Sequence, residues 1–325
     1  MRIVFHGENA ASFSEGFGWL LDIEAEIVIL PDVLATDADR EAYAGADVII
    51  GVRFGADLPR PTRLKLFHVP GAGYDAVNLA QLPASAVVCN CFGHEQAIAE
   101  YVMAALLMHH VPLSDADGRL RRGEWAYWAG APERVHDEMA GKIIGLLGFG
   151  HIGRAIAARA KAFEMIVHAA NRSPVAPSES VDRTFTLDQL PTFWGSMDIL
   201  VVSLPLTEET RGIVDAGAFA AMRPSAVVVN VGRGPTIDET ALFEALRTNR
   251  IAAAVIDTWY AYPSSDRSVV LPSALPFHEL PNVLMTPHMS GWTHGTIRRR
   301  QRTIADNVMR RASGRACKNV VRGDH

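Results

Sequence analysis

The sequence predicts an α/β protein built from two doubly wound parallel-sheet domains, Rossmann-like or flavodoxin-like, with a cleft between them. Short apolar runs alternate with helix-length segments along most of the chain, which is the pattern of βαβ units rather than of a β-sandwich. The chain has 325 residues, more than one hydrophobic core usually serves, so we expect two domains.

The first set of strands occupies the N-terminal part of the chain. Its apolar runs, in order, are "RIVFHG", "EIVIL", "ADVIIGV", "LKLFHVPGAG" and "SAVVCN". The stretch "HEQAIAEYVMAALLMHH" at 94–110 then predicts a long apolar helix, which Pro112 ends. This helix is apolar around more of its circumference than one buried face requires, so we expect a second surface to cover it.

A second set of strands follows this helix. Its runs are "KIIGLLGFG", "MIVHAAN", "DILVVSLP", "AVVVNVG", "AAAVIDTW" and "NVLMTPH". They are almost continuously apolar, as expected of strands buried on both faces of a parallel sheet. We therefore predict one domain over 94–289 and a discontinuous domain made of 1–93 and 290–325, in which the final helical segment folds back onto the first strands.

Charge and cysteine content indicate which binding partners and which cellular compartment the protein has. The net charge of −5 disfavours nucleic acid or an anionic membrane as the main partner, and the basic run "RRRQR" at 298–302 is interpreted as a solvated face or subunit contact. Cys89, Cys91 and Cys317 form no CxxC pair and do not suit a disulfide framework, which fits a reducing cytosol. The start of the chain reads as a strand and turn, and no apolar run approaches the length of a membrane span. We therefore predict a cytoplasmic protein with no membrane partner, and we predict no metal site.

The glycine-rich turn "GFGHIG" predicts a dinucleotide site. It follows an apolar run and opens the helical pattern "RAIAARAKAF", which is the context that a diphosphate-binding turn requires. Gly148 permits the tight turn, Gly150 lets the diphosphate approach the backbone, and Gly153 allows close packing of helix and strand. The helix N-terminus, at His151 and Ile152, faces the phosphates. The domain over 94–289 is therefore predicted to bind the cofactor, and the discontinuous domain to bind the substrate.

The end of the next strand indicates which cofactor binds. An acid that would hold the adenosine ribose of NAD is expected there, but the chain has Asn171, Arg172 and Ser173. An acid would repel a 2′-phosphate, whereas the guanidinium of Arg172 matches phosphate geometry and Ser173 adds a hydroxyl. NADP is thus favoured over NAD. The alternative is that Arg172 points to solvent and that NAD binds with Asn171 on its ribose.

Four linked motifs resemble those of the D-isomer-specific 2-hydroxyacid dehydrogenases. They are "GKIIGLLGFGHIG", "VVSLPLTEETRGIVD", "VVVNVGRGPTIDE" and "NVLMTPHMSG", and they occur in the order and spacing of that family. The resemblance extends to "GAGYDAVNL" and "AIAEYVMAALL" in the first half of the chain. It implies a hydride transfer between NADP or NAD and a small 2-oxo or 2-hydroxy acid, and a homodimer that pairs through the helix over 94–110.

The resemblance also implies the roles of individual residues. Arg233 matches the arginine that binds the substrate carboxylate, and His288 matches the acid/base, for which an imidazole is suited near neutral pH. Asp257 matches a residue that contacts the nicotinamide carboxamide. The loop "VPGAGYD" is expected to offer the backbone N–H groups of Ala72 and Gly73 to the substrate carboxylate. The remaining cofactor contacts are expected at Leu204, Pro205, Val231 and Gly232, with Arg233 and His288 also beside the cofactor.

One position departs from the family pattern. The family places a glutamate that holds the histidine protonated where this chain has Tyr262. A carboxylate raises a histidine pKa, whereas a phenol orients the ring without supplying charge. His288 is therefore expected to be less readily protonated, which weakens carbonyl reduction at alkaline pH. Asp266 or Glu279 is an alternative source of the missing acid.

Two alternative functions remain open at this point. Formate dehydrogenases of the same superfamily carry glutamine at the Tyr262 position and need no proton transfer, although His94 replaces an asparagine of those enzymes. A non-catalytic module that senses NAD(H) is compatible with loss of the glutamate, but retention of Arg233 and His288 argues against it. The aromatic side chains of Trp125, Tyr127, Trp128 and Trp292 are candidates for the lining of a substrate pocket.

Overall fold

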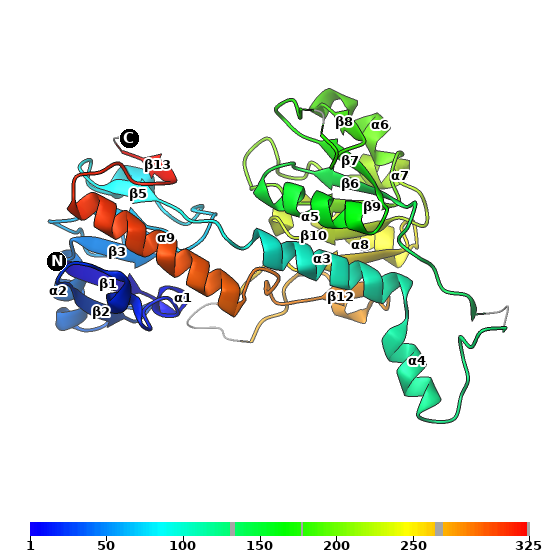
Figure 1. Ribbon diagram of the computed structural model, residues 1–325, viewed down its shortest axis with the longest axis horizontal. Coiled ribbons are helices and arrows are strands. Elements are labelled where there is room, and N and C mark those ends of the chain that lie inside the picture. Colours follow the sequence, from blue (N-terminus) through cyan, green and yellow to red (C-terminus); the bar gives the residue numbers. More distant parts are fainter. Residues whose placement is uncertain (131–133, 177, 264–268, 324–325) are drawn as a thin grey trace. The chain divides into compact units, whose positions relative to one another are not determined.

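The computed structural model describes residues 1–130, 134–176, 178–263 and 269–323. The chain forms two compact units, Met1–His94 with Trp292–His325, and Glu95–Gly291. Each unit contains one sheet with helices beside it (Figure 1). The predicted α/β class with two doubly wound, largely parallel sheets is confirmed.

The first unit contains a six-stranded sheet in the order β13-β5-β4-β3-β1-β2. Its strands are β1 (Arg2–His6), β2 (Glu26–Leu30), β3 (Val48–Gly51), β4 (Leu66–His68), β5 (Val87–Cys89) and β13 (Val320–Arg322). The first five strands are parallel in the flavodoxin-like order. The sixth, β13, was not predicted and runs antiparallel to β5, with Val320 opposite Cys89.

Alternate residues of these strands supply the two faces of the core. Along β1, Val4 faces a cluster that includes Tyr43 of α2 (Asp37–Ala44), while Ile3 and Phe5 face the other side. Helix α9 (His294–Ala312) covers that other side, where Ile304 and Val308 are fully buried (Figure 1). A short helix, α1 (Glu8–Ala11), follows β1. The C-terminal helix therefore packs within the first unit.

The second unit contains a seven-stranded sheet in the order β12-β11-β10-β9-β6-β7-β8, and every pair in it is parallel. Its strands are β6 (Ile143–Leu147), β7 (Ile166–Ala170), β8 (Arg183–Phe185), β9 (Ile199–Val202), β10 (Val227–Asn230), β11 (Ala253–Ile256) and β12 (Val283–Met285). The strand order reverses between β6 and β9. In open α/β sheets, ligands bind outside the carboxyl ends of the strands at such a point.

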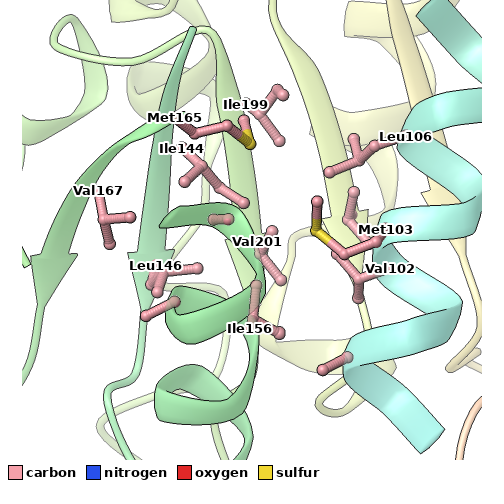
Figure 2. Packing of buried hydrophobic residues seen from close by; sticks show 14 of the residues in the cluster. Val102, Met103, Leu106, Ile144, Leu146, Ile156, Met165, Val167, Ile199 and Val201 are labelled. Carbon is pink, nitrogen blue, oxygen red and sulfur yellow. The ribbon is translucent and has the colours of Figure 1, made fainter. Parts of the chain in front are cut away.

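Helices cover both faces of this second sheet. On one face lie α3 (Glu95–His110) and α5 (His151–Ala162), whose apolar side chains pack onto β6, β7 and β9 (Figure 2). On the other face lie α6 (Leu190–Trp194), α7 (Ala216–Ala221) and α8 (Glu239–Arg247). Asp215 and Asp238 cap α7 and α8 by accepting hydrogen bonds from backbone N–H groups.

Beyond α3, the chain leaves the body of the second unit. Helix α4 (Leu113–Leu120) and the segment after it form an extension that stands away from the sheet (Figure 1). Among the helices of the described ranges, none alone is long and apolar enough to span a bilayer; α3 and α4 meet that test only as a pair bent by 51°.

Candidate active site

The glycine turn lies at the switch point of the second sheet, between β6 and α5. Gly148 has a φ of +97°, which favours glycine, and a Cβ on Gly153 would lie 2.4 Å from the carbonyl oxygen of Gly148. Gly150 differs from both, because its φ is −81° and a Cβ there would meet no protein atom within 4 Å. The protein itself does not require glycine at this position. The open space fits a group that approaches the backbone, as a cofactor diphosphate does.

Residues from the neighbouring strand ends meet this turn. The Ser203 hydroxyl donates a hydrogen bond to the carbonyl oxygen of Gly148 at 3.1 Å. A Cβ on Gly232 would lie 2.6 Å from the carbonyl oxygen of Leu204, and one on Gly148 would lie 3.0 Å from the Leu204 side chain. Gly148, Leu204 and Gly232 are therefore packed together at the carboxyl ends of β6, β9 and β10. Ser203 was not among the predicted site residues.

Pro205 and Val231, two other predicted cofactor contacts, have different surroundings. The Pro205 carbonyl accepts a hydrogen bond from Thr210 at 2.7 Å, which fixes the loop after β9. The Val231 side chain is buried in the apolar core between the sheet and α3. Any contact of Val231 with a cofactor would thus come from its backbone.

The residues at the end of β7 tie that strand to the glycine turn. The Asn171 side chain accepts a hydrogen bond from the Phe149 backbone at 3.2 Å and donates one to the Ser173 carbonyl at 2.9 Å. Arg172 and Ser173 are exposed. A hydrogen bond from Thr207, one from the backbone and the charge of Arg172 lower the pKa of the Glu209 carboxyl. The charge of Arg172 thus reaches an acid on another loop, which was not predicted from the sequence.

His288 lies just after β12 in a strained backbone conformation. Its φ is +57°, in the left-handed region that costs a non-glycine residue about 1–2 kcal/mol. Buried Asp257 holds the surrounding loop, since its carboxylate accepts hydrogen bonds from the Thr286 hydroxyl at 2.6 Å and from the backbone of Met289 at 2.8 Å and Ser290 at 3.0 Å. The carboxylate that the sequence suggested as a cofactor contact therefore positions the loop that carries His288.

A second set of contacts fixes the same loop at Thr286. The Thr286 hydroxyl lies 2.7 Å from the Tyr101 hydroxyl of α3, and its carbonyl accepts a hydrogen bond from the Trp259 indole at 2.8 Å. Burial raises the pKa of Tyr101 to about 12, so this phenol is neutral at physiological pH. Tyr101, Thr286 and Trp259 were not identified from the sequence, because their contacts join elements that are distant along the chain.

Tyr262 occupies the place expected for the residue that orients His288. Its hydroxyl lies 3.0 Å from Nδ1 of His288 and accepts a hydrogen bond from the Trp259 backbone at 3.1 Å. Partial burial raises the pKa of Tyr262, against the hydrogen bond from Trp259 and the charge of Arg233. The hydroxyl can donate to Nδ1 of a neutral imidazole and accept from Nδ1–H of an imidazolium, since it has both a proton and a lone pair.

The backbone of Arg233 is fixed between β10 and a short 3-10 helix, Gly234–Thr236. Its carbonyl accepts hydrogen bonds from the Thr236 hydroxyl at 2.6 Å and the Asn230 amide at 3.1 Å. Its guanidinium donates to the Gly232 carbonyl at 2.9 Å and acts electrostatically on Tyr262. The second unit thus gathers a guanidinium, an imidazole and a phenol at the carboxyl edge of its sheet.

The predicted substrate loop belongs to the first unit. The Ala72 carbonyl accepts a hydrogen bond from the Asn90 amide at 2.7 Å, and the Gly71 carbonyl accepts one from the Cys91 backbone at 3.0 Å. These bonds anchor the loop, which includes Gly73, to the segment after β5.

The remaining candidates are distributed over both units. Trp125, Tyr127 and Trp128 lie in the segment that follows α4. Trp292 packs edge to face on Phe13 in the first unit. Glu279 lies before β12, whereas His288 follows that strand. The Glu279 carboxylate is 3.9 Å from His278. Asp266 lies outside the described residues. Within the described ranges, no three His, Cys, Asp or Glu side chains gather as metal ligands.

The switch-point glycine turn and the histidine at the sheet edge are arranged as expected of a nicotinamide-dependent oxidoreductase. Comparison with known proteins identifies the family. The model of the D-isomer-specific 2-hydroxyacid dehydrogenase NAD-binding domain matches residues 103–290. A glyoxylate/hydroxypyruvate reductase B from Citrobacter koseri is 32% identical over 291 residues, which cover 86% of each chain.

Solved structures agree with this match. A D-isomer-specific 2-hydroxyacid dehydrogenase family protein from Aeromonas salmonicida has a TM-score of 0.83 at 24% identity, with 99% of each chain covered. A D-isomer-specific 2-hydroxyacid dehydrogenase from Xanthobacter autotrophicus, in complex with NADPH and MES, has a TM-score of 0.79 at 28% identity, with 98% of this chain and 97% of that one covered. The chain belongs to the D-isomer-specific 2-hydroxyacid dehydrogenase family, as its motifs suggested, and it is an NAD(P)-dependent enzyme.

Proposed function

We propose that the enzyme reduces a small 2-oxo acid to the D-2-hydroxy acid with NADPH, and that His288 and Arg233 carry the reaction. The observation that carries this proposal is the hydrogen bond between Tyr262 and His288 beside the charge of Arg233. Glyoxylate and hydroxypyruvate are the first substrates to test, because relatives such as the Citrobacter koseri reductase are named for them.

In this proposal, each side chain has one task. Arg233 binds the substrate carboxylate through its planar guanidinium, which suits a bidentate contact. His288 gives a proton to the carbonyl oxygen during reduction and takes it back during oxidation. Tyr262 orients the imidazole of His288 in both its neutral and its protonated form. Asp257 holds the loop that carries His288. The bound nicotinamide supplies the hydride.

Residues of the glycine turn would hold the cofactor. Gly148, Gly150 and Gly153 would place the diphosphate against the N-terminus of α5, at His151 and Ile152. Arg172 would bind the 2′-phosphate, which favours NADP. Glu209 acts against that preference because its carboxylate would repel the same phosphate.

We also propose a role in substrate binding for the loop of the first unit. The backbone N–H groups of Ala72 and Gly73 would bind the substrate carboxylate, since the loop that holds them is anchored by Asn90. We also propose a homodimer paired through α3, with no nucleic acid or membrane partner.

The proposal is tested by a panel of 2-oxo acids assayed with NADPH and NADH in parallel. Glyoxylate, hydroxypyruvate and phenylpyruvate sample small, polar and large side chains, and formate with NAD⁺ and NADP⁺ tests the formate-type alternative. Turnover of at least one 2-oxo acid, lost in Arg233→Ala and His288→Gln, is the expected result. Cofactor binding without turnover of any of them would instead favour a sensing module.

A further inference from the structure

Two of the three cysteines meet in the first unit although they are far apart in sequence. Cys89 is fully buried in β5, and Cys317 lies half-buried in the connection between α9 and β13. Both thiols are free and both contact one apolar cluster, together with Val308 and Val320. The antiparallel pairing of β13 with β5, in which Val320 faces Cys89, keeps the two segments in contact.

The two thiols interact directly. The Cys89 thiol donates a hydrogen bond to the Cys317 sulfur. The Cys317 thiol in turn donates one to the Asn307 carbonyl at 3.7 Å. The hydrogen bond from Cys89, followed by the charges of Arg311 and Arg310, lowers the pKa of Cys317 to about 7 against burial and the opposing charge of Asp306. The same hydrogen bond, together with burial, raises the pKa of Cys89, which keeps its proton. The more accessible sulfur is therefore the better nucleophile.

We propose that Cys89 and Cys317 form a reversible disulfide when the enzyme meets hydrogen peroxide. The Cys317 thiolate attacks one peroxide oxygen, so that an S–O bond forms, the O–O bond breaks and hydroxide leaves as water after protonation. The Cys89 sulfur then loses its proton and attacks the sulfenic acid sulfur; the S–S bond forms and the S–O bond breaks, releasing a second water. One peroxide is reduced, two thiols are oxidised, and a dithiol reverses the change.

The disulfide would act on the loop proposed to bind the substrate. The Cys89 carbonyl accepts a hydrogen bond from the Val69 backbone at 2.8 Å, at the start of that loop. The next residue, Asn90, holds the Ala72 carbonyl. A bond between β5 and the C-terminal segment thus restrains the strand end that supports the loop. This consequence, unlike the disulfide itself, rests on the proposed function.

The full-length protein is treated with hydrogen peroxide, the remaining thiols are blocked with N-ethylmaleimide, and peptides are mapped by mass spectrometry. We expect a crosslink between the Cys89 and Cys317 peptides, with Cys91 alone alkylated, and recovery of all thiols after dithiothreitol. Cys317→Ser removes the crosslink. The control Cys91→Ser keeps it, because the Cys91 thiol is buried two residues from Cys89 and faces the Val69 carbonyl at 3.5 Å.

Other outcomes overturn the proposal. A crosslink that includes Cys91, or a Cys317 oxidised beyond the sulfenic acid with Cys89 still free, would show that the two thiols do not react as a pair. Kinetics then test the consequence for the loop: oxidation should change KM for the active 2-oxo acid in wild type and in Cys91→Ser, with no change in Cys317→Ser. A crosslink without a KM change would overturn the coupling to the loop. The mapping requires no activity, so it is independent of the proposed function.

Discussion

The hydroxyl of Tyr262 lies 3.0 Å from Nδ1 of His288, where a carboxylate would be expected from the family pattern. A carboxylate only accepts hydrogen bonds and stabilises the imidazolium, whereas a phenol can donate or accept and carries no charge. The contact therefore preserves the orientation of the histidine and removes one source of electrostatic support for its charged form.

Asp257→Asn should lower kcat more than it raises KM. The amide cannot accept all three hydrogen bonds that the carboxylate accepts from Thr286, Met289 and Ser290, so the loop carrying His288 shifts. A displacement on the order of 1 Å costs about 100-fold in rate. Steady-state kinetics measure the effect. Asp238→Asn is the control, since asparagine caps α8 as well as aspartate does; an unchanged kcat in Asp257→Asn would contradict the positioning role.

Arg172→Ala should weaken NADPH binding by about 1.5–3 kcal/mol, the contribution of a charge-assisted hydrogen bond, and leave NADH nearly unchanged. Glu209→Gln should act in the opposite direction and improve NADPH binding, because it removes the negative charge beside Arg172. Dissociation constants from fluorescence titration measure both effects. Equal losses for the two cofactors in Arg172→Ala would mean that the guanidinium does not bind the 2′-phosphate.

The protein should sediment as a homodimer at micromolar concentration. Met108 at the end of α3, Leu113 and Leu120 on α4, and Trp125 beyond it are exposed apolar residues that a partner would cover. Replacing Met108 of α3 and the neighbouring Leu113 with aspartate should shift the protein toward monomer. Trp19→Ser, a change at an even more exposed residue of the first unit, should not. A monomeric wild type would contradict the proposal.

The free energy of unfolding should fall as pH drops from 6.5 to 4. Burial lowers the pKa of His68 from 6.5 to about 4, so the unfolded chain binds a proton in this range that the folded chain does not. The resulting loss below pH 4 is on the order of 3 kcal/mol. In His68→Gln, which can still accept a hydrogen bond from Asn307, denaturant unfolding should show a smaller pH slope. An identical slope would exclude His68 as its source.

The sequence predicted the elements whose signals are local. The glycine turn, the buried strands and the long helix over 94–110 follow from spacing and apolar periodicity. Contacts between residues distant in sequence were not predictable from one chain. They include the pairing of β13 with β5, the contact of Tyr101 with Thr286, the pair of thiols, and the interaction of Glu209 with Arg172. Asp257 was identified as a site residue, but its hydrogen bonds to the loop around His288 required the fold.

The pH dependence of kcat/KM for reduction of the active 2-oxo acid tests the central claim most directly, because it reports groups on the free enzyme. If His288 donates the proton and Tyr262 orients it, reduction in the wild type fades as pH rises and the imidazolium is lost. Tyr262→Glu should move this decline upward by about 1 pH unit or more, since a carboxylate raises a histidine pKa. Tyr262→Phe should lower the rate without moving the decline upward. A folded Tyr262→Glu enzyme whose decline coincides with that of the wild type would contradict the account.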